Sequence, residues 1–211
     1  MVQLEFAEFL RSHPKHPLNS DQIAKLTEFY GLVVQENAVQ NLTRLISPSE
    51  FYEGHVEDVL ALKQTGYLSE SNIDLGTGLG SPGLIYAALF GGKWVLCDSE
   101  KSKAKFVEDA ARKLNISNVI GVGERLEVYL ATHKVECVVA KAVGPVERIH
   151  NWIRNSSTWN KLVLFKGPGW LKEWEDFQKT SQRKKLVIQN QYTYEVGVEK
   201  KSRIIIELVR S

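Results

Sequence analysis

Cysteine and long apolar runs are both scarce in this sequence, and each absence narrows the classes of protein to consider. The two cysteines, Cys97 and Cys137, lie inside separate apolar segments (WVLCD and ECVVAK). This placement favours buried thiols in a reducing compartment over a disulfide or a metal site. No apolar stretch approaches the roughly 20 residues that cross a bilayer, and the first residues lack the apolar core of a signal peptide. We therefore expect a cytoplasmic protein with no membrane segment and no metal.

A strong net charge of either sign is also absent. Lys and Arg number 27 against 25 Asp and Glu, for a formal net charge of +2, and this balance neither requires nor excludes a nucleic-acid partner. The absence of a repeat with a period of roughly 20 to 50 residues argues against a solenoid or propeller. With 211 residues, 43% of them hydrophobic, the chain fits one domain of ordinary size with an extension.

The first part of the chain, residues 1–70, is expected to form a helical extension packed on the domain that follows it. One helix is predicted over Leu4–Arg11 and ends before the two prolines of residues 13–17. A second helix is predicted from Ser20-Asp21, which can cap it, and its apolar residues then recur at helical spacing.

A third helix has a clear start signal at Ser47-Pro48-Ser49-Glu50. Ser47 is its expected N-cap, Pro48 its first residue, and Glu50 completes a capping box. We predict that this helix runs past His55 and Asp58 to about Lys63.

From residue 71 to residue 211 short apolar runs alternate with helical segments, which predicts a mostly parallel sheet covered on both faces. The predicted strands are 72–75, 93–97, 119–122, 136–141 and 161–166. Two more strands, 185–196 and 202–209, read as an antiparallel hairpin, so the sheet should end in one reversed strand. The fold class is therefore α/β: a Rossmann-like, mostly parallel seven-stranded sheet with a C-terminal antiparallel hairpin.

A glycine loop, residues 76–82, joins the first predicted strand to the next helix. Glycines permit positive φ, let a ligand approach the backbone, and leave amides free at a helix N-terminus. A literal G-x-G-x-x-G match at Gly78, Gly80 and Gly83, with Asp98 twenty residues beyond Gly78, would indicate NAD. The strand ends by residue 75, however, so the turn begins at Gly76 and the motif reads Asp-x-Gly-x-Gly-x-Gly.

The acidic residue before the first glycine favours a different ligand. Asp74 suits a ligand with a cationic amino acid end, such as the methionine part of S-adenosylmethionine, and would repel a nearby pyrophosphate. Pro82 is expected in the first turn of the following helix, where a missing N–H has no cost. A glycine-rich turn without a ligand is the remaining alternative.

Two further groups of residues follow the next predicted strands. Asp98-Ser99 ends the second strand, where a carboxylate can accept hydrogen bonds from two ribose hydroxyls of NAD or S-adenosylmethionine alike, or can cap the helix over 99–114. The segment Gly123-Glu124-Arg125-Leu126-Glu127 follows the third strand, at the edge where an adenine ring would lie. Charged residues at such a position can equally begin a solvated helix.

Together these motifs resemble a known family, the 16S rRNA guanine-N7 methyltransferases called RsmG or glucose-inhibited division protein B. The likeness extends over nearly the whole chain and depends most on Asn41-Leu42-Thr43 and on Gly80-Ser81-Pro82-Gly83. It also includes Asn37, His55, Asp58, Asp74 through Leu79, Asp98-Ser99, Arg125 through Glu127, Lys141-Ala142 and Lys166-Gly167.

The resemblance implies a Rossmann-like methyltransferase that uses S-adenosylmethionine and acts on 16S rRNA or the small ribosomal subunit. We also expect a monomer, although the sequence does not determine the oligomeric state. The cofactor-binding residues that it implies are Asp74, Gly76, Thr77, Gly78, Gly80, Ser81, Asp98, Ser99, Arg125, Leu126, Glu127 and Lys141. The residues that would position the substrate are Lys141, Lys166, Asn41 and His55.

Three positions depart from the family's pattern. Ser81 stands where the family usually has a bulky apolar residue, and Lys141 stands where it usually has arginine. Val59 follows Asp58 where the family tends to have serine. Lysine keeps the charge of arginine but lacks the planar fork that grips a phosphate or carboxylate in two places.

Methylation at guanine N7 uses a lone pair that is already free, so no general base is required and catalysis would depend on proximity. A cation beside N7 would hinder the reaction, and Lys141 and Lys166 are therefore assigned to phosphate or substrate positioning. His55 could instead be a packing residue, and Asn41 and Arg44 could cap a turn rather than reach over the cofactor.

Other features have two interpretations each. The basic runs Arg183-Lys184-Lys185 and Lys200-Lys201-Ser202-Arg203 could hold RNA phosphates or simply be solvated. The late tryptophans, Trp152, Trp159, Trp170 and Trp174, could stack on bases or pack in the core. The rival functions are methylation of a small molecule or a protein, and RNA binding by an assembly factor with little catalysis.

Overall fold

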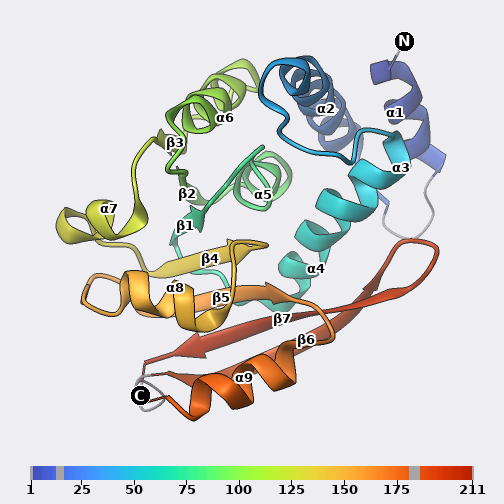
Figure 1. Ribbon diagram of the computed structural model, residues 1–211. Coiled ribbons are helices and arrows are strands. Elements are labelled where there is room, and N and C mark those ends of the chain that lie inside the picture. The colour runs from blue at the N-terminus through green and yellow to red at the C-terminus, as the bar shows by residue number, and fades with distance from the viewer. Residues whose placement is uncertain (1, 13–16, 181–185, 211) are drawn as a thin grey trace.

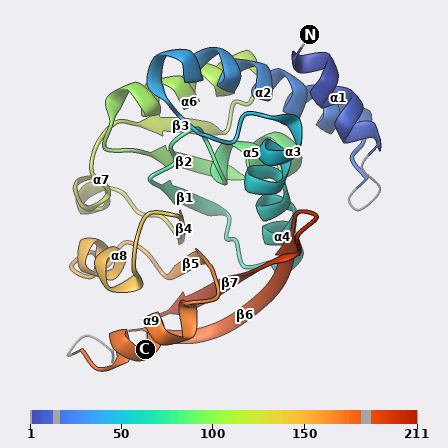
Figure 2. The ribbon, with the colours of Figure 1, turned by 45° about the vertical axis from the view of Figure 1, so that its right-hand side comes forward.

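The computed structural model describes residues 2–12, 17–180 and 186–210, and its strands form one sheet in the order β3-β2-β1-β4-β5-β7-β6, as Figure 2 shows. The strands are β1 (Ser71–Leu75), β2 (Lys93–Cys97), β3 (Val119–Val122), β4 (Cys137–Lys141), β5 (Lys161–Lys166), β6 (Val187–Val196) and β7 (Lys201–Val209). β1 to β5 are parallel to one another, and β7 runs antiparallel to both β5 and β6. The predicted seven-stranded, mostly parallel sheet with a terminal hairpin is confirmed.

The place of the reversed strand differs from the prediction. β7 lies between β5 and β6, so the edge strand is β6, which is parallel to β5 because it pairs with β7 in antiparallel register. β7 carries the apolar run Ile204–Ile206 and Leu208, whereas most residues of β6 are exposed. Burial therefore assigns β7 the inner position and β6 the edge. The expected start of the hairpin at Lys185 lies outside the described residues.

Helices cover both faces of the sheet (Figures 1 and 2). They are α1 (Val2–Ser12), α2 (Ser20–Gln40), α3 (Pro48–Phe51), the π-helical turn η1 (Tyr52–Val56), α4 (Glu57–Thr65), α5 (Gly83–Phe90), α6 (Lys101–Lys113), α7 (Leu126–Thr132), α8 (Val146–Ile153) and α9 (Trp170–Gln178). The helices α1 to α6 pack on one face, and α7 to α9 on the other. None of the described helices is long and apolar enough to cross a membrane.

Alternating side chains of the strands divide the core into two halves. In β2, Trp94 and Leu96 join the core under α1 to α6, while Val95 and Cys97 join the core under α7 to α9. Cys137 of β4 belongs to the first half, so the two thiols lie on opposite faces of the sheet. Both are free and buried, as predicted, and burial raises the pKa of each thiol to about 12.

The N-terminal helices begin at local capping signals. Ser47, Pro48 and Glu50 form the predicted capping box and first turn of α3. Asn19 caps α2 through a capping box with Gln22, so the predicted cap at Ser20-Asp21 is one residue late. The helix predicted up to Lys63 runs from α3 to α4 but is interrupted by the π-helical turn η1. The turn predicted at residues 13–17 lies almost wholly outside the described residues.

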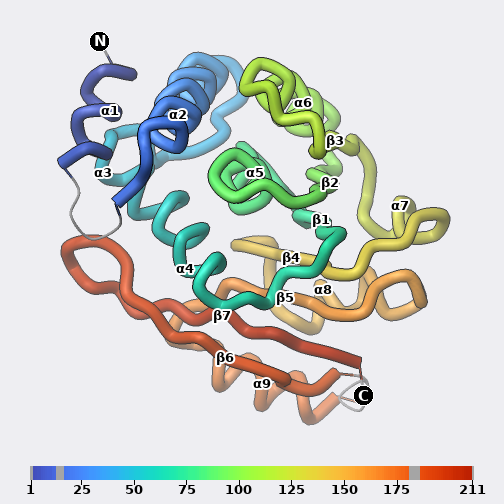
Figure 3. The backbone as a smooth tube through the Cα atoms, turned by 180° about the vertical axis from the view of Figure 1, so that it is seen from behind, coloured from blue at the N-terminus to red at the C-terminus, as the bar shows by residue number. Residues whose placement is uncertain are grey.

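The extension, residues 1–70, shares its core with the sheet domain, residues 71–211. Phe6, Leu26 and Phe51 of the extension belong to the same buried cluster as Leu84 of α5 and Leu96 of β2. The hairpin β6–β7 reaches past the sheet to α3 and α4 (Figures 1 and 3). The extension is therefore packed against both the first helix and the last strands of the sheet domain.

Candidate active site

The glycine loop turns sharply across the carboxyl end of β2. Gly76, Gly78 and Gly80 have φ of 67°, 55° and 107°, a region that side chains with a Cβ rarely occupy. The backbone amides of Gly76 and Thr77 donate to the carbonyl of Cys97, at 2.8 and 3.1 Å. The glycines that the sequence supplies are thus required by the path of the loop.

Asp74 lies beneath this loop and is fully buried. Its Oδ2 accepts hydrogen bonds from the Thr77 hydroxyl at 2.8 Å and from the Gly83 amide at 2.9 Å. Burial raises the pKa of Asp74 to about 7, and its Oδ1 has no hydrogen-bond partner among the described residues. The carboxylate therefore braces the loop from within the fold. Pro82 is the N-cap of α5, one residue before the helical turn in which it was predicted.

A cavity of about 320 Å³ opens at the carboxyl ends of β1, β2 and β3. It brings together six residues predicted to bind the cofactor: Gly76, Asp98, Ser99, Arg125, Leu126 and Glu127. The cavity is completed by Glu124, from the segment expected beside an adenine, by Trp152, one of the tryptophans considered for base stacking, and by Leu75, Cys97 and Val143, which the sequence alone did not assign to a site. Thr77, Gly78, Gly80, Ser81 and Lys141 lie in or beside the loop without lining this cavity.

Asp98 ends β2 at the wall of the cavity and is 8% exposed. Its Oδ2 accepts from the Gly78 amide and its Oδ1 from the Glu100 amide, each at 3.0 Å. The second of these bonds holds the amide of Glu100, the N-cap of α6, and this helix has no side-chain cap, so Asp98 supports the start of α6 without capping it. Each carboxylate oxygen retains a further lone pair, which leaves room for the ribose hydroxyls of a bound nucleoside.

The charge of the cavity is mainly acidic. Asp98, Glu124 and Glu127 contribute three carboxylates, against the one guanidinium of Arg125. Such a lining favours a ligand with a net positive charge and disfavours a pyrophosphate. The described residues contain no group of three or more His, Cys, Asp and Glu side chains that could hold a metal ion.

The backbone after β4, whose Val143 lines the cavity, is strained. Ala142 has a φ of 58° and Gly144 a φ of 151°. Strained backbone of this kind concentrates at functional sites. Val143 between them approaches the glycine loop so closely that a Cβ on Gly76 would lie 3.0 Å from its Cγ2. The sequence carried no signal for this bend, since alanine rarely adopts the left-handed region.

Lys141 ends β4 and its ammonium is engaged by the protein. The Nζ atom lies 2.8 Å from Asp58 Oδ2, 2.6 Å from the Gly54 carbonyl and 3.1 Å from the Ser81 hydroxyl. Asp58 is 1% exposed, and Arg203 also contacts its carboxylate, at 2.5 Å. Burial acts to raise the pKa of Asp58, but the two cations outweigh it and hold that pKa below its usual value.

Lys166, the second lysine predicted to position the substrate, is held in the same manner. Its Nζ lies 2.7 Å from Glu173 and 2.8 Å from the Gly144 carbonyl, and it sits over the ring of Trp170. Lys166 therefore secures the strained loop after β4. Neither lysine presents a free ammonium at the surface.

His55 and Asn41 have mainly structural contacts. His55 Nε2 lies 3.3 Å from the Thr43 hydroxyl, and its ring packs against Phe51. Burial, followed by the nearby Lys141 cation, lowers the pKa of His55 to about 3, so the ring is neutral at pH 7. Asn41 is the left-handed C-cap of α2, with its backbone amide bonded to Asn37. These contacts match the packing and capping interpretations.

The two basic runs and the late tryptophans differ in their surroundings. Residues 183–185, one of the two basic runs, lie outside the described residues. In the other run Lys201 pairs with Glu199, and Arg203 pairs with Asp58. Trp159 and Trp170 are buried in the core, whereas Trp152 lines the cavity.

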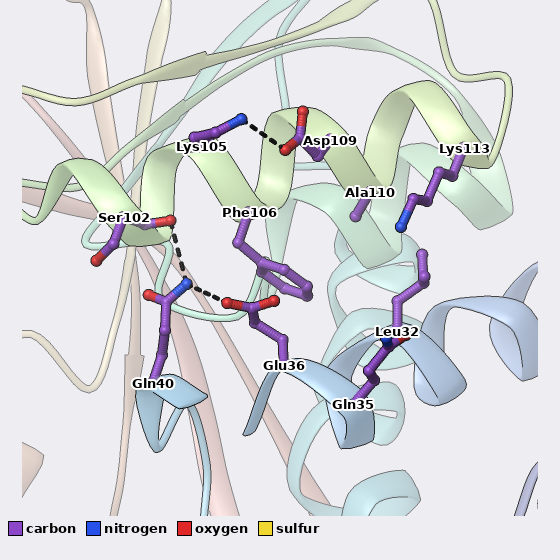
Figure 4. A pocket seen from close by; sticks show the side chains of 10 residues that line it. All are labelled: Leu32, Gln35, Glu36, Gln40, Ser102, Lys105, Phe106, Asp109, Ala110 and Lys113. Carbon is purple, nitrogen blue, oxygen red and sulfur yellow. Dashed lines mark hydrogen bonds and ion pairs between the residues drawn. The ribbon is translucent and has the colours of Figure 1, made fainter. Parts of the chain in front are cut away.

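A second hollow, of about 280 Å³, lies between α2 and α6 (Figure 4). Part of its polar lining is paired internally: Gln40 donates to Glu36, and Lys105 pairs with Asp109. Phe106 and Ala110 lie beneath them. This groove lacks the free carboxylates of the cavity at the strand ends, and we do not assign a ligand to it.

Solved structures with a similar arrangement of strands and helices identify the class of fold. The chain aligns over 100% of its length with 86% of MtNAS in complex with MTA and tNA, at a TM-score of 0.60 and 13% identity. It also aligns over 78% of its length with 41% of the Pyrococcus abyssi tRNA (uracil-54, C5)-methyltransferase in complex with S-adenosyl-L-homocysteine, at a TM-score of 0.55 and 14% identity. The fold is the Rossmann-like methyltransferase fold.

Sequence comparison narrows this class to one family. The GidB family, described as rRNA small subunit methyltransferase G, matches residues 22–203, and the chain belongs to this family. Ribosomal RNA small subunit methyltransferase G of Solibacter usitatus is 28% identical over 97% of this chain and 100% of its own length. Its namesake from Mesoplasma florum is 30% identical over 79% of this chain and 72% of its own length. The resemblance inferred from the motifs is confirmed.

Proposed function

We propose that this protein transfers the methyl group of S-adenosylmethionine to N7 of a guanine in 16S rRNA. The observation that carries the proposal is the acidic cavity at the carboxyl edge of the sheet, with Asp98 at the end of β2. S-adenosylmethionine is net positive at neutral pH, whereas NAD carries a negative pyrophosphate. The sign of the lining therefore favours S-adenosylmethionine.

The residues present fit such a cofactor. Asp98 has free lone pairs for the ribose hydroxyls, and Leu126 and Glu127 provide an apolar and a polar contact for the adenine. The glycine loop, Gly76 to Gly80, would hold the methionine end, with Asp74 fixing its shape from below. When bound, the cofactor supplies an electrophilic methyl group.

The protein's own part in the reaction is to hold the guanine and to accommodate charge. Guanine N7 has a free lone pair, so no residue has to remove a proton before the attack. The residues that line the cavity include no histidine or lysine. Its thiol, Cys97, stays protonated because burial raises the pKa of that group to about 12. A guanine methylated at N7 gains a positive charge, and the carboxylates of the cavity would favour that developing charge.

An RNA substrate is supported by cations around the cavity. Each helix after β2, β3, β4 and β5 has an exposed cation at or near its start: Lys101 is the first residue of α6, Arg125 directly precedes α7, and Arg148 and Lys172 are the third residues of α8 and α9. None of the four forms an ion pair with a carboxylate in the part of the chain that the structure describes. Free cations at this edge would face the phosphates of 16S rRNA or of the small ribosomal subunit. We propose a cytoplasmic monomer that acts on this partner.

The test is methyl transfer from labelled S-adenosylmethionine to 16S rRNA and 30S subunits that lack the modification. Wild-type protein should label one N7-methylguanine. Asp98→Ala should bind the cofactor about 100-fold more weakly, because it loses two charge-assisted hydrogen bonds to the ribose. Asp109→Ala, on the exposed face of α6, should behave as wild type. Cofactor binding without transfer to RNA would contradict the proposal and favour a small-molecule or protein substrate.

A further inference from the structure

The ammonium of Lys141 is surrounded by three acceptors from the protein itself. They are Gly54 O at 2.6 Å, Asp58 Oδ2 at 2.8 Å and Ser81 Oγ at 3.1 Å. The contacts with Gly54 and Ser81 are hydrogen bonds of the ammonium, and the contact with Asp58 is an ion pair. The side chain of Lys141 is only 15% exposed. A phosphate could reach this ammonium only through the small part of its surface that these three groups leave exposed.

The three acceptors belong to two separate parts of the chain. Gly54 lies in the π-helical turn η1, and Asp58 follows it one turn later at the start of α4. Ser81 lies in the glycine loop, next to the proline that caps α5. Lys141 thus joins the N-terminal extension to the loop that would hold the cofactor.

The glycine loop needs such an anchor. Bonds to Cys97, Asp74 and Asp98 hold residues 76–78, but the glycines with positive φ keep the backbone permissive. A ligand binds more weakly when it must also order its site. The contact from Lys141 to Ser81 restricts the loop at the end opposite to Gly76. Asp58, which holds Lys141 in place, is in turn fixed by Tyr194 and Arg203 of the hairpin.

We infer that Lys141 is a positioning residue that fixes the glycine loop against the N-terminal extension, and that it does not contact rRNA phosphates. This inference rests on the proposed function, because it assumes that the loop binds S-adenosylmethionine. It also replaces the assignment of Lys141 to phosphate positioning that the sequence suggested. Ser81 supplies the hydroxyl through which Lys141 contacts the loop, and the bulky apolar residue usual at this position in the family would lack it.

Lys141→Met provides the first test, with Lys161→Met as the matched control. Lys161 also forms a part-buried ion pair, with Glu207 at 3.1 Å, but it stands at the amino end of β5. We expect Lys141→Met to weaken S-adenosylmethionine binding about tenfold, the effect of losing hydrogen bonds to a charged group. The KM for the cofactor should rise by the same factor. Lys161→Met should lower stability and leave the affinity for the cofactor unchanged.

The salt dependence of rRNA binding distinguishes positioning from phosphate contact. A plot of log affinity against log salt concentration has a negative slope, and loss of one phosphate contact reduces the magnitude of this slope by about 0.7 to 0.9. We expect the slope of Lys141→Met to equal that of the wild type. A lower slope in this variant would overturn the inference while leaving the methyltransferase assignment intact, and wild-type protein that fails to bind the cofactor would overturn that assignment instead.

Ser81→Ala keeps the inference testable if Lys141→Met does not fold. This variant removes one of the three contacts, so we expect a loss of affinity for S-adenosylmethionine of about threefold, smaller than that of Lys141→Met. In the double variant Ser81→Ala should add nothing to the effect of Lys141→Met, because both act through one contact. Unchanged affinity in Ser81→Ala, or additive losses in the double variant, would overturn the inference.

Discussion

Replacement of Gly83 by alanine should break the contact between α5 and the sheet beneath the candidate site. A Cβ at this position would lie 2.6 Å from Leu96 Cδ2 and 2.9 Å from both Cβ and Oδ2 of Asp74. The Leu96 methyl lies at the end of a flexible side chain. Asp74 cannot move away, because its carboxylate is bonded to Thr77 and to the Gly83 amide itself. The N-terminus of α5 must therefore shift away from β1.

Two losses and one gain set the size of the effect. Overpacking a core costs about 1 to 3 kcal/mol, and the weakened bond from the Gly83 amide to a buried carboxylate costs about 1.5 to 3 kcal/mol. Alanine is favoured over glycine in a helix by about 1 kcal/mol, since Gly83 has no positive φ to preserve. The losses exceed the gain, and we expect the free energy of unfolding to fall by about 3 kcal/mol.

Equilibrium unfolding in urea measures this change directly. Gly167→Ala is the matched control, because an added Cβ there meets nothing within 4 Å and the residue has no positive φ. The control should stay within about 0.5 kcal/mol of the wild type. If Gly83→Ala were equally neutral, Asp74 would not be holding the helix against the strand, and our account of the loop would be wrong.

Two further predictions concern charge. His55, whose pKa burial lowers from 6.5 to about 3, binds a proton in the unfolded chain but not in the folded one between these values. We therefore compare the unfolding free energy of the wild type with that of His55→Gln. The wild-type value minus the variant value should be constant above pH 7.5 and should fall on acidification below about pH 6.5, by up to about 1.4 kcal/mol per pH unit. A difference that does not change with pH would contradict this. Lys101→Met, at the strand-end rim, should lower the salt slope of rRNA binding by about 0.7 to 0.9, whereas Lys134→Met, exposed between α7 and β4, should not. Equal slopes for the two variants would remove Lys101 from the RNA surface.

The strands could be predicted from the sequence because their signals are local. Apolar runs such as Lys93–Cys97 and Lys161–Lys166 begin and end as predicted, since charged residues, glycine or proline lie next to them. The order of β6 and β7 was less accessible, because it depends on which strand can bury more apolar surface against β5. The residue pattern within one strand does not show which of the two strands buries more apolar surface.

The part of the candidate site whose residues directly follow a strand could be predicted from the sequence. Asp98, Arg125 and Glu127 follow strand ends directly and meet in one cavity. The side-chain contacts of Lys141 were not predictable, because its acceptor Gly54 is 87 positions away. The π-helical turn that contains this glycine and the left-handed Ala142 also depend on packing across the fold. No local residue pattern specifies them.

The bond between Asp58 and the hairpin has a consequence for biosynthesis. Asp58 and Arg203 are 145 positions apart in the chain, so the N-terminal helices leave the ribosome long before the hairpin does. Until β6 and β7 emerge, the Asp58 carboxylate lacks two of its partners and must remain hydrated, which keeps this part of the extension from closing. In this member of an rRNA methyltransferase family, the extension around Asp58 therefore reaches its native packing only after the ribosome has synthesised those two strands.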